Sequence, residues 1–129
     1  MRKTLLTLAI GTVIAGVPVY AHHSFAAFYN ESQSISLQGT IHEFHYKAPH
    51  AIVVFNVPDS LGRQQKYEAE WANPSRLQRQ GITTSTLRPG DVVVVTGSPG
   101  RNASENKVHL KGIRRMSDGW TWSGGNRRR

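Results

Sequence analysis

Cysteine is missing from all 129 residues of the sequence. A disulfide framework, a thiolate metal site and a lipoprotein anchor are therefore excluded. Acidic residues are scarce, with eight Asp and Glu against sixteen Lys and Arg, so the formal net charge is +8. No internal repeat is found, and the length is enough for one small domain but not for two. Without disulfides, such a domain must be held together by its hydrophobic core.

The sequence also lacks the short motifs on which common enzyme classes depend. No serine stands in the context of a nucleophile elbow, and no glycine-rich loop follows a strand and opens a helix as phosphate-binding loops do. Glu68 and Glu70 share one strand face, so they lack the distinct environments that separate a catalytic acid from a base. We therefore expect a protein that is not an enzyme.

The N-terminal segment is typical of a secretory signal peptide covering residues 1–21. A short basic stretch precedes an apolar run from Leu5 to Val17, Pro18 ends that run, and Val19-Tyr20-Ala21 fits a signal peptidase site. Cleavage after Ala21 would leave no transmembrane segment and a mature chain that starts His22-His23-Ser24-Phe25. The alternative is an uncleaved membrane anchor, because the apolar run approaches the shortest length that spans a bilayer.

Residues 22–122 have the pattern of an all-β domain. An irregular lead-in is expected at 24–32, and the polar, glycine-rich stretch 98–106 is expected to be a mobile loop. Alternating apolar residues predict five strands, and the first is long, with a phase slip that indicates a β-bulge. The five expected strands are 35–46, 51–57, 66–71, 92–97 and 107–113, and one more short strand could lie within 116–122.

One short helix is expected between the third and fourth strands. It starts at Pro74 with Asn73 as its N-cap, and it ends near Gln80 with Gly81 as the terminating glycine. Five strands with a helix at this place match an OB-like barrel, and an open sandwich is the alternative architecture. Residues 123–129 form a basic tail that is expected to be disordered, with attraction to a polyanion or an anionic lipid as the alternative role.

His22 and His23 become candidate metal ligands if the signal peptide is removed. A terminal histidine offers its α-amine and a ring nitrogen, and a histidine at the second position adds a deprotonated amide nitrogen. Closely spaced nitrogen donors of this kind suit a tetragonal Cu(II) site. The alternative is that both are ordinary polar residues at a chain end.

His50 follows Pro49 at a strand entrance, where a side chain is held rigidly at a barrel rim. A carboxylate at Glu70 could orient a metal-bound imidazole from the second shell. It could instead form a cross-strand ion pair with Lys66 or Lys111, which is the more usual arrangement.

The remaining histidines are weaker candidates. His42 and His45 lie around the expected bulge, where they could converge, although at least one is expected to face solvent. His109 lies on the polar face of the last long strand and is the weakest candidate of the six histidines.

The chain resembles the DUF6152 family of small exported bacterial proteins, on motifs in the family's order and approximate spacing. The resemblance rests on these segments: 22–27, 37–44, 48–51, Glu70 with 73–75, 80–83, 87–92 and 95–97. Two positions depart from the family's pattern, with Ala48 where Asn is typical and Tyr46 where Trp is common. The resemblance implies a periplasmic location, this fold and the presence of the three histidines His22, His23 and His50, and it implies no reaction.

Together these features predict a periplasmic binding protein. The site would hold Cu(II) through His22, His23 and His50, with Glu70 in the outer shell. The alternative is an OB-like interaction module for a protein, peptide or polyanion without metal, and export makes nucleic acid an unfavoured partner. A metal-dependent oxidase or hydrolase at the same site is a third, weaker alternative.

Overall fold

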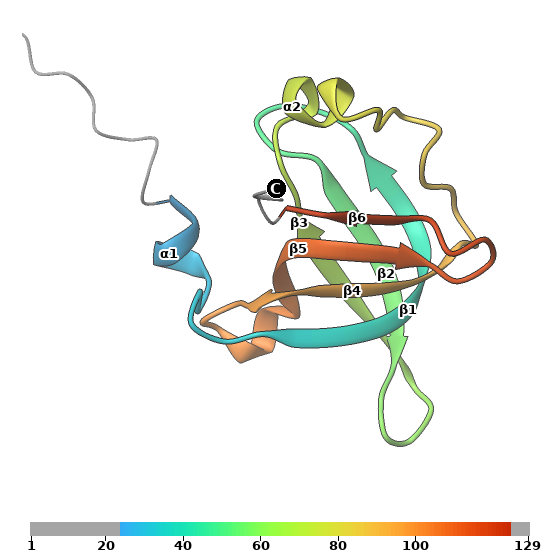
Figure 1. Cartoon of the computed structure of the whole chain (residues 1–129). Coiled ribbons are helices and arrows are strands. Elements are labelled where there is room, and N and C mark those ends of the chain that lie inside the picture. The colour runs from blue at the N-terminus through green and yellow to red at the C-terminus, as the bar shows by residue number, and fades with distance from the viewer. Residues whose placement is uncertain (1–23, 125–129) are drawn as a thin grey trace, which may run out of the picture.

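The computed structural model describes residues 24–124, and Figure 1 shows the course of this chain. The predicted signal peptide, His22, His23 and residues 125–129 of the predicted tail lie outside the described residues. Within 24–124 no helix has the length and apolar character needed to cross a membrane. The elements are α1 (Ser24–Phe28), β1 (Ile35–His45), β2 (Ile52–Pro58), β3 (Gln64–Glu70), α2 (Pro74–Arg79), β4 (Val92–Pro99), η1 (Ala103–Glu105), β5 (Lys107–Arg115) and β6 (Thr121–Ser123).

The strands form a closed five-stranded barrel, which confirms the predicted OB-like architecture. The sheet order is β3-β2-β1-β4-β5-β6, and a further parallel pairing between β3 and β5 closes it. All other strand pairs are antiparallel. Closure hides the edges of the five barrel strands, which an open sandwich would leave exposed. The short β6 extends the sheet beside β5 (Figure 1) and ends at Ser123, one residue beyond the predicted domain boundary.

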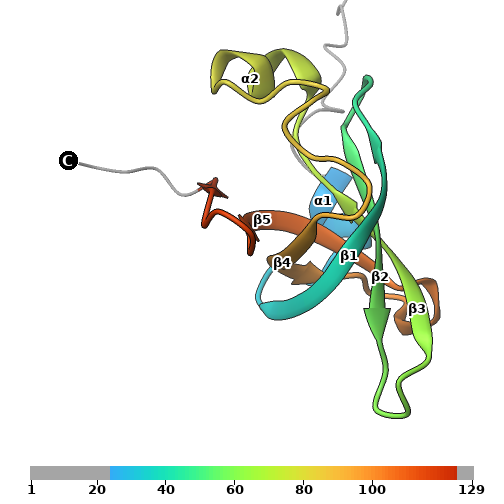
Figure 2. The same cartoon turned by 90° about the vertical axis from the view of Figure 1, so that its right-hand side faces the viewer.

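The long first strand bends around the barrel, as Figure 2 shows, so that it pairs with both β2 and β4. The register with β2 shifts between Ile41 and Glu43, which confirms the predicted bulge. Gly39 lies just before it, where a Cβ would stand 2.4 Å from the carbonyl oxygen of Asn56. Only glycine fits this close approach between β1 and β2.

The core fills the barrel interior and is sealed at one end by the segment after β3. Val53, Val54 and Phe55 are consecutive buried residues of β2, as its unbroken apolar run predicts. At the end capped by α2, Leu77 and Ile82 are almost completely buried. The other buried apolar residues are Tyr29, Ile41, Ala51, Ala69, Trp71, Leu87, Val93, Val95, Val108, Leu110 and Ile113.

The helix α2 has the predicted ends. The Asn73 side chain accepts a hydrogen bond from the amide of Ser75, and Pro74 occupies the first turn. Gly81 follows with a φ of +81°, a left-handed conformation that favours glycine at this position. Local capping chemistry therefore sets both boundaries of the helix.

Two segments differ from their predictions. The lead-in is not irregular, because Ser24–Phe28 forms α1 and the buried Tyr29 pairs with Gly100 in an isolated bridge. The stretch 98–106 is not a loop throughout, because β4 continues to Pro99 and η1 follows with Asn102 as its N-cap. Both differences have the same physical cause, because the two segments pack against each other and each stabilises the regular structure of the other.

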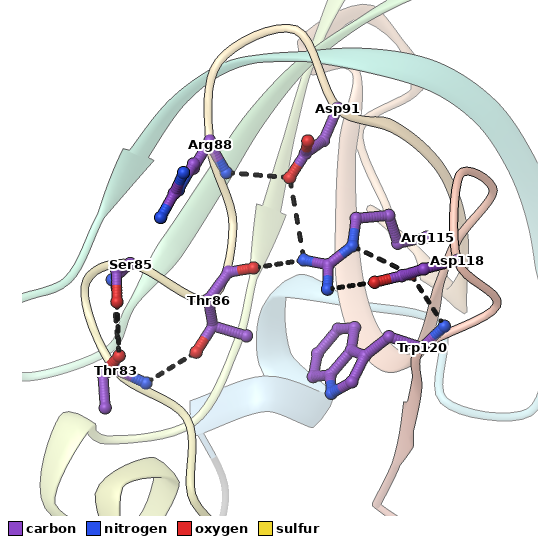
Figure 3. A network of polar contacts seen from close by, with 8 residues as sticks. All are labelled: Thr83, Ser85, Thr86, Arg88, Asp91, Arg115, Asp118 and Trp120. Carbon is purple, nitrogen blue, oxygen red and sulfur yellow. Dashed lines mark hydrogen bonds and ion pairs between the residues drawn. The ribbon is translucent and has the colours of Figure 1, made fainter.

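A polar network around Arg115 ties the segment after α2 to the turn after β5 (Figure 3). The guanidinium donates to the carboxylate of Asp118 and to the carbonyl of Thr86, lies 3.8 Å from the Asp91 carboxylate, and covers the ring of Trp120 at 5.3 Å. The Arg115 guanidinium thus has partners in both of the segments that it joins. We interpret the network as a structural clasp between these two loops.

Candidate functional site

The parallel pairing that closes the barrel also brings together a group of hydrogen-bonded histidine and carboxylate side chains. In this pairing Glu70 of β3 lies opposite His109 of β5. The helix α1 lies beside the same seam, held there by backbone hydrogen bonds such as those from Arg101 to Phe28 and from Asn30 to Pro99. The group, called here the histidine–carboxylate cluster, comprises Phe25, Tyr29, Glu31, His50, Glu70, His109 and Lys111.

One half of the cluster is a chain of hydrogen bonds that ends on His50. Nδ1 of His50 lies 2.8 Å from Oε1 of Glu70, and the hydroxyl of Tyr29 donates to Oε2 of the same carboxylate at 2.6 Å. Burial, and then the hydrogen bond to Glu70, raise the pKa of Tyr29 above its usual value. Tyr29 therefore stays a proton donor, and both oxygens of Glu70 have defined partners.

The other half is built around Glu31. Its Oε1 lies 2.7 Å from Nδ1 of His109, and its Oε2 lies 2.7 Å from Nζ of Lys111. Burial acts to raise the pKa of Glu31, but the hydrogen bonds from Lys111 and His109 outweigh it and lower that pKa. His109 and His50 are thus held in the same way, each with Nδ1 against a carboxylate.

The ring of Phe25 contacts both imidazoles. It stacks on His109 with a centroid distance of 3.8 Å and an interplanar angle of 5°, and its centroid lies 4.9 Å from that of His50. Tyr29 adds a tilted contact to His109 at 5.6 Å. Phe25 therefore fastens the start of the described chain between the two halves of the cluster.

A cleft of about 620 Å³ opens beside the cluster. Trp71 and Trp122 form an aromatic wall, with centroids 5.0 Å apart in an edge-to-face contact, and Gln80 accepts from the indole of Trp122. Nε1 of Trp71 is buried and has no hydrogen-bond partner within residues 24–124. The lining consists of Phe25, His50, Trp71, Ala72, Asn73, Arg76, His109, Leu110, Lys111, Trp122 and Gly124.

The structure brings together two of the four predicted site residues, His50 and Glu70. It shows that Glu70 contacts His50 and Tyr29 and does not form the alternative ion pair with Lys66 or Lys111, since Lys111 is taken by Glu31. Within residues 24–124 no three side chains of His, Cys, Asp or Glu are grouped as a metal site needs. A metal site at His50 therefore requires further donors, and His22 and His23, outside the described residues, remain the predicted ones.

The other histidines fall into two classes. His42 and His45 both lie near the Glu43 carboxylate, at 3.7 and 2.7 Å, and both are largely exposed at the bulge. His109 belongs to the cluster, although it is the weakest candidate among the histidines when judged from the sequence alone. The alternation of β5 does place His109 on the polar face, but nothing in that pattern indicates that α1 covers this face.

Comparisons with known proteins define the family and add little about function. The DUF6152 pattern, described as a family of unknown function, matches residues 11–109. No curated protein matches the chain.

Two solved structures illustrate the likeness in fold. The first is the ZRD-deleted mutant of TiaS in complex with agmatine, with 21% identity and a TM-score of 0.46 over 70% of this chain. The aligned part is only 26% of that TiaS chain. The second is Rim1, a mitochondrial single-stranded DNA binding protein from S. cerevisiae, with 21% identity and a TM-score of 0.44, over 65% of this chain and 93% of Rim1. The family match spans most of the barrel, and the chain therefore belongs to DUF6152.

Proposed function

We propose that this chain is an exported, periplasmic Cu(II)-binding protein whose processed N-terminus forms a metal site with His50. The amine and ring of His22 supply the first donors, and His23 and His50 complete the site. The observation that carries the proposal is the pair formed by His50 and Glu70, with Nδ1 and Oε1 2.8 Å apart at the edge of the cleft.

This pair fixes the tautomer that a metal requires. A carboxylate accepts this hydrogen bond, so Nδ1 of His50 is the donor, and in the neutral ring Nε2 is the nitrogen that carries the lone pair. Carboxylate-backed imidazoles of this kind are the usual arrangement around protein-bound metals. Tyr29 supports it further by holding the second oxygen of Glu70.

The length of the chain supports the participation of the predicted N-terminus. Phe25 contacts His50 directly, and His22 precedes it by only three residues. A chain of that length spans at most about 11 Å between Cα atoms, whatever its conformation. The amine of a chain that starts at His22 can therefore reach the cluster, because the His22 Cα lies no more than about 11 Å from that of Phe25.

Cu(II) is the metal that best fits this donor set. An α-amine, imidazole nitrogens and an available backbone amide favour the tetragonal geometry of Cu(II), and its affinity for nitrogen donors exceeds that of the neighbouring divalent ions. The amine is available only if peptidase cleavage follows Ala21. Export and metal binding are thus linked in one proposal.

Copper titration of two matched proteins tests the proposal, followed by electron paramagnetic resonance. Both chains begin at His22, one with a free amine and the other with that amine acetylated, which removes the amine donor without creating a new terminal site. We expect the first to bind one Cu(II) with a nitrogen-rich spectrum and the second to bind at least about tenfold more weakly. Equal affinity of the two chains would overturn the site.

Substitutions within the described part provide the second arm. His50→Gln and Glu70→Gln should each weaken Cu(II) binding about tenfold or more, since one removes a ligand and the other its support. His45→Gln, at an exposed histidine that pairs with Glu43, is the matched control and should leave affinity unchanged. Unchanged affinity in His50→Gln, with thermal melts showing a folded protein, contradicts the proposal. The mass of the periplasmic protein checks export and the cleavage position.

A further inference from the structure

The cleft beside the cluster has features that the metal site does not use. Its walls are mainly aromatic and aliphatic, formed by the partly exposed Phe25 and Trp122 in front of the buried Trp71 and Leu110. A flat apolar ring would find edge and face contacts with indole groups there, and such pairs add to the gain from burying apolar area. The volume of about 620 Å³ lies within the range of small-molecule sites.

The charged groups of the lining all favour an anion. They are Arg76 and Lys111, and no carboxylate lines the cleft. Glu31 and Glu70 lie behind the imidazoles and are already satisfied by the cluster. Lys111 is neutralised by Glu31, whereas Arg76 has no carboxylate partner among residues 24–124. Arg76 is therefore the uncompensated cation of the lining.

We propose that this cleft binds a small aromatic carboxylate. The ring packs against Trp122 and Phe25, with the buried Trp71 directly behind them, and the carboxylate accepts hydrogen bonds from Arg76 at the rim. A guanidinium matches the planar, bidentate geometry of a carboxylate. A multiply charged anion would lose more hydration free energy on entering the apolar part of the cleft than its interaction with a single cation would restore.

The proposal is independent of copper and is tested on metal-free protein in the presence of a chelator. The probes are naphthoate and its neutral analogue naphthamide, which differ only in the charged group. Binding is followed through the three indole N–H resonances in NMR spectra, assigned with single Trp→Phe variants. We expect naphthoate to shift the resonances of Trp71 and Trp122 at saturation and naphthamide to bind about fivefold or more weakly, because it lacks the charge-assisted bonds.

Trp120 serves as an internal reference. It lies beneath the Arg115 guanidinium in the clasp and is not part of the cleft lining. Its resonance should stay in place throughout the titration. Equal shifts at all three indoles would show non-specific association with aromatic surface and would overturn the assignment of the ligand to this cleft.

The charged contact is tested by a matched pair of substitutions on α2. Arg76 and Arg79 are both exposed on the same short helix, but only Arg76 lines the cleft. Arg76→Gln should weaken naphthoate about fivefold to tenfold and leave naphthamide unchanged, whereas Arg79→Gln should change neither. Loss of naphthoate binding in both variants, or in neither, would overturn the proposal, and so would no binding to the unaltered protein. None of these outcomes affects the copper titration.

Discussion

Replacing Tyr29 by phenylalanine removes one hydroxyl and tests whether the chain Tyr29–Glu70–His50 stabilises the folded barrel. The hydroxyl is 2.6 Å from Glu70, and Tyr29 is only 3% exposed. A hydrogen bond to a charged group contributes about 1.5–3 kcal/mol. The Glu70 side chain is 31% exposed, so water replaces part of the lost contact. We therefore expect a loss of about 1–2 kcal/mol in the free energy of unfolding.

Urea unfolding followed by tryptophan fluorescence measures this loss. With a slope typical of a domain of this size, the midpoint should fall by about 1 M. Tyr67→Phe is the control, because Tyr67 is a half-buried tyrosine of β3 that packs on Phe55. Its hydroxyl makes no hydrogen bond to any group within residues 24–124. That variant should lie close to the unaltered protein.

A double-mutant cycle assigns the effect to the carboxylate. In the Tyr29→Phe background, Glu70→Gln should lower the free energy of unfolding by less than it does in the unaltered protein, because the hydrogen bond between Tyr29 and Glu70 is already absent. A coupling energy of less than about 0.3 kcal/mol is within the scatter of independent sites. Such a value would refute the reasoning, since it would mean that the hydroxyl and the carboxylate do not act as a unit.

Two further predictions concern the barrel and its clasp. Gly97→Ala should destabilise the fold by about 3 kcal/mol or more in the same urea assay, because its Cβ would stand 1.9 Å from the His109 carbonyl oxygen. Gly112→Ala is its control, since the nearest atom there is 3.7 Å away, and an equal cost at both positions would contradict the steric argument. The Arg115 hydrogen bond, and then the amide of Trp120, lower the pKa of Asp118 to about 2, so the charged form stabilises the fold above the ordinary value of 3.8. The melting temperature of the unaltered protein should exceed that of Asp118→Asn near pH 6. This difference in melting temperature should disappear as the pH falls from about 4 to about 2. A difference that is constant with pH would be inconsistent with the ion pair.

The barrel could be predicted because its determinants are local. Alternation sets the strand faces, Asn73, Pro74 and Gly81 mark the helix, and the phase slip in the first strand marks the bulge. Each signal is contained within a few neighbouring residues, and the structure reproduces each of them. Element order favours the OB-like barrel but leaves the open sandwich as an alternative, and the pairing of β3 with β5 in the structure excludes that alternative.

The lead-in helix could not be predicted in the same way. Ser24–Phe28 is five residues long, shorter than any segment that forms a helix on its own in water. Its order comes from tertiary contacts, chiefly the Phe25 stack on His109 and the burial of Tyr29. Because the sequence shows no helical period there, these two aromatic residues could not be identified as parts of a site.

The same distinction explains why only His50 and Glu70, two of the seven cluster residues, were predicted as site residues. Glu70 and His50 stand beside each other because β2 and β3 form an ordinary hairpin, whose register follows from a short turn between 58 and 64. His109 meets the cluster through the parallel pairing of β3 with β5, which joins residues almost forty positions apart and depends on closure of the whole barrel. The role of a polar residue on a strand face cannot be inferred until the element that covers that face is known. In this chain the covering element is α1, and its docking converts a solvent-facing histidine into the second carboxylate-backed imidazole.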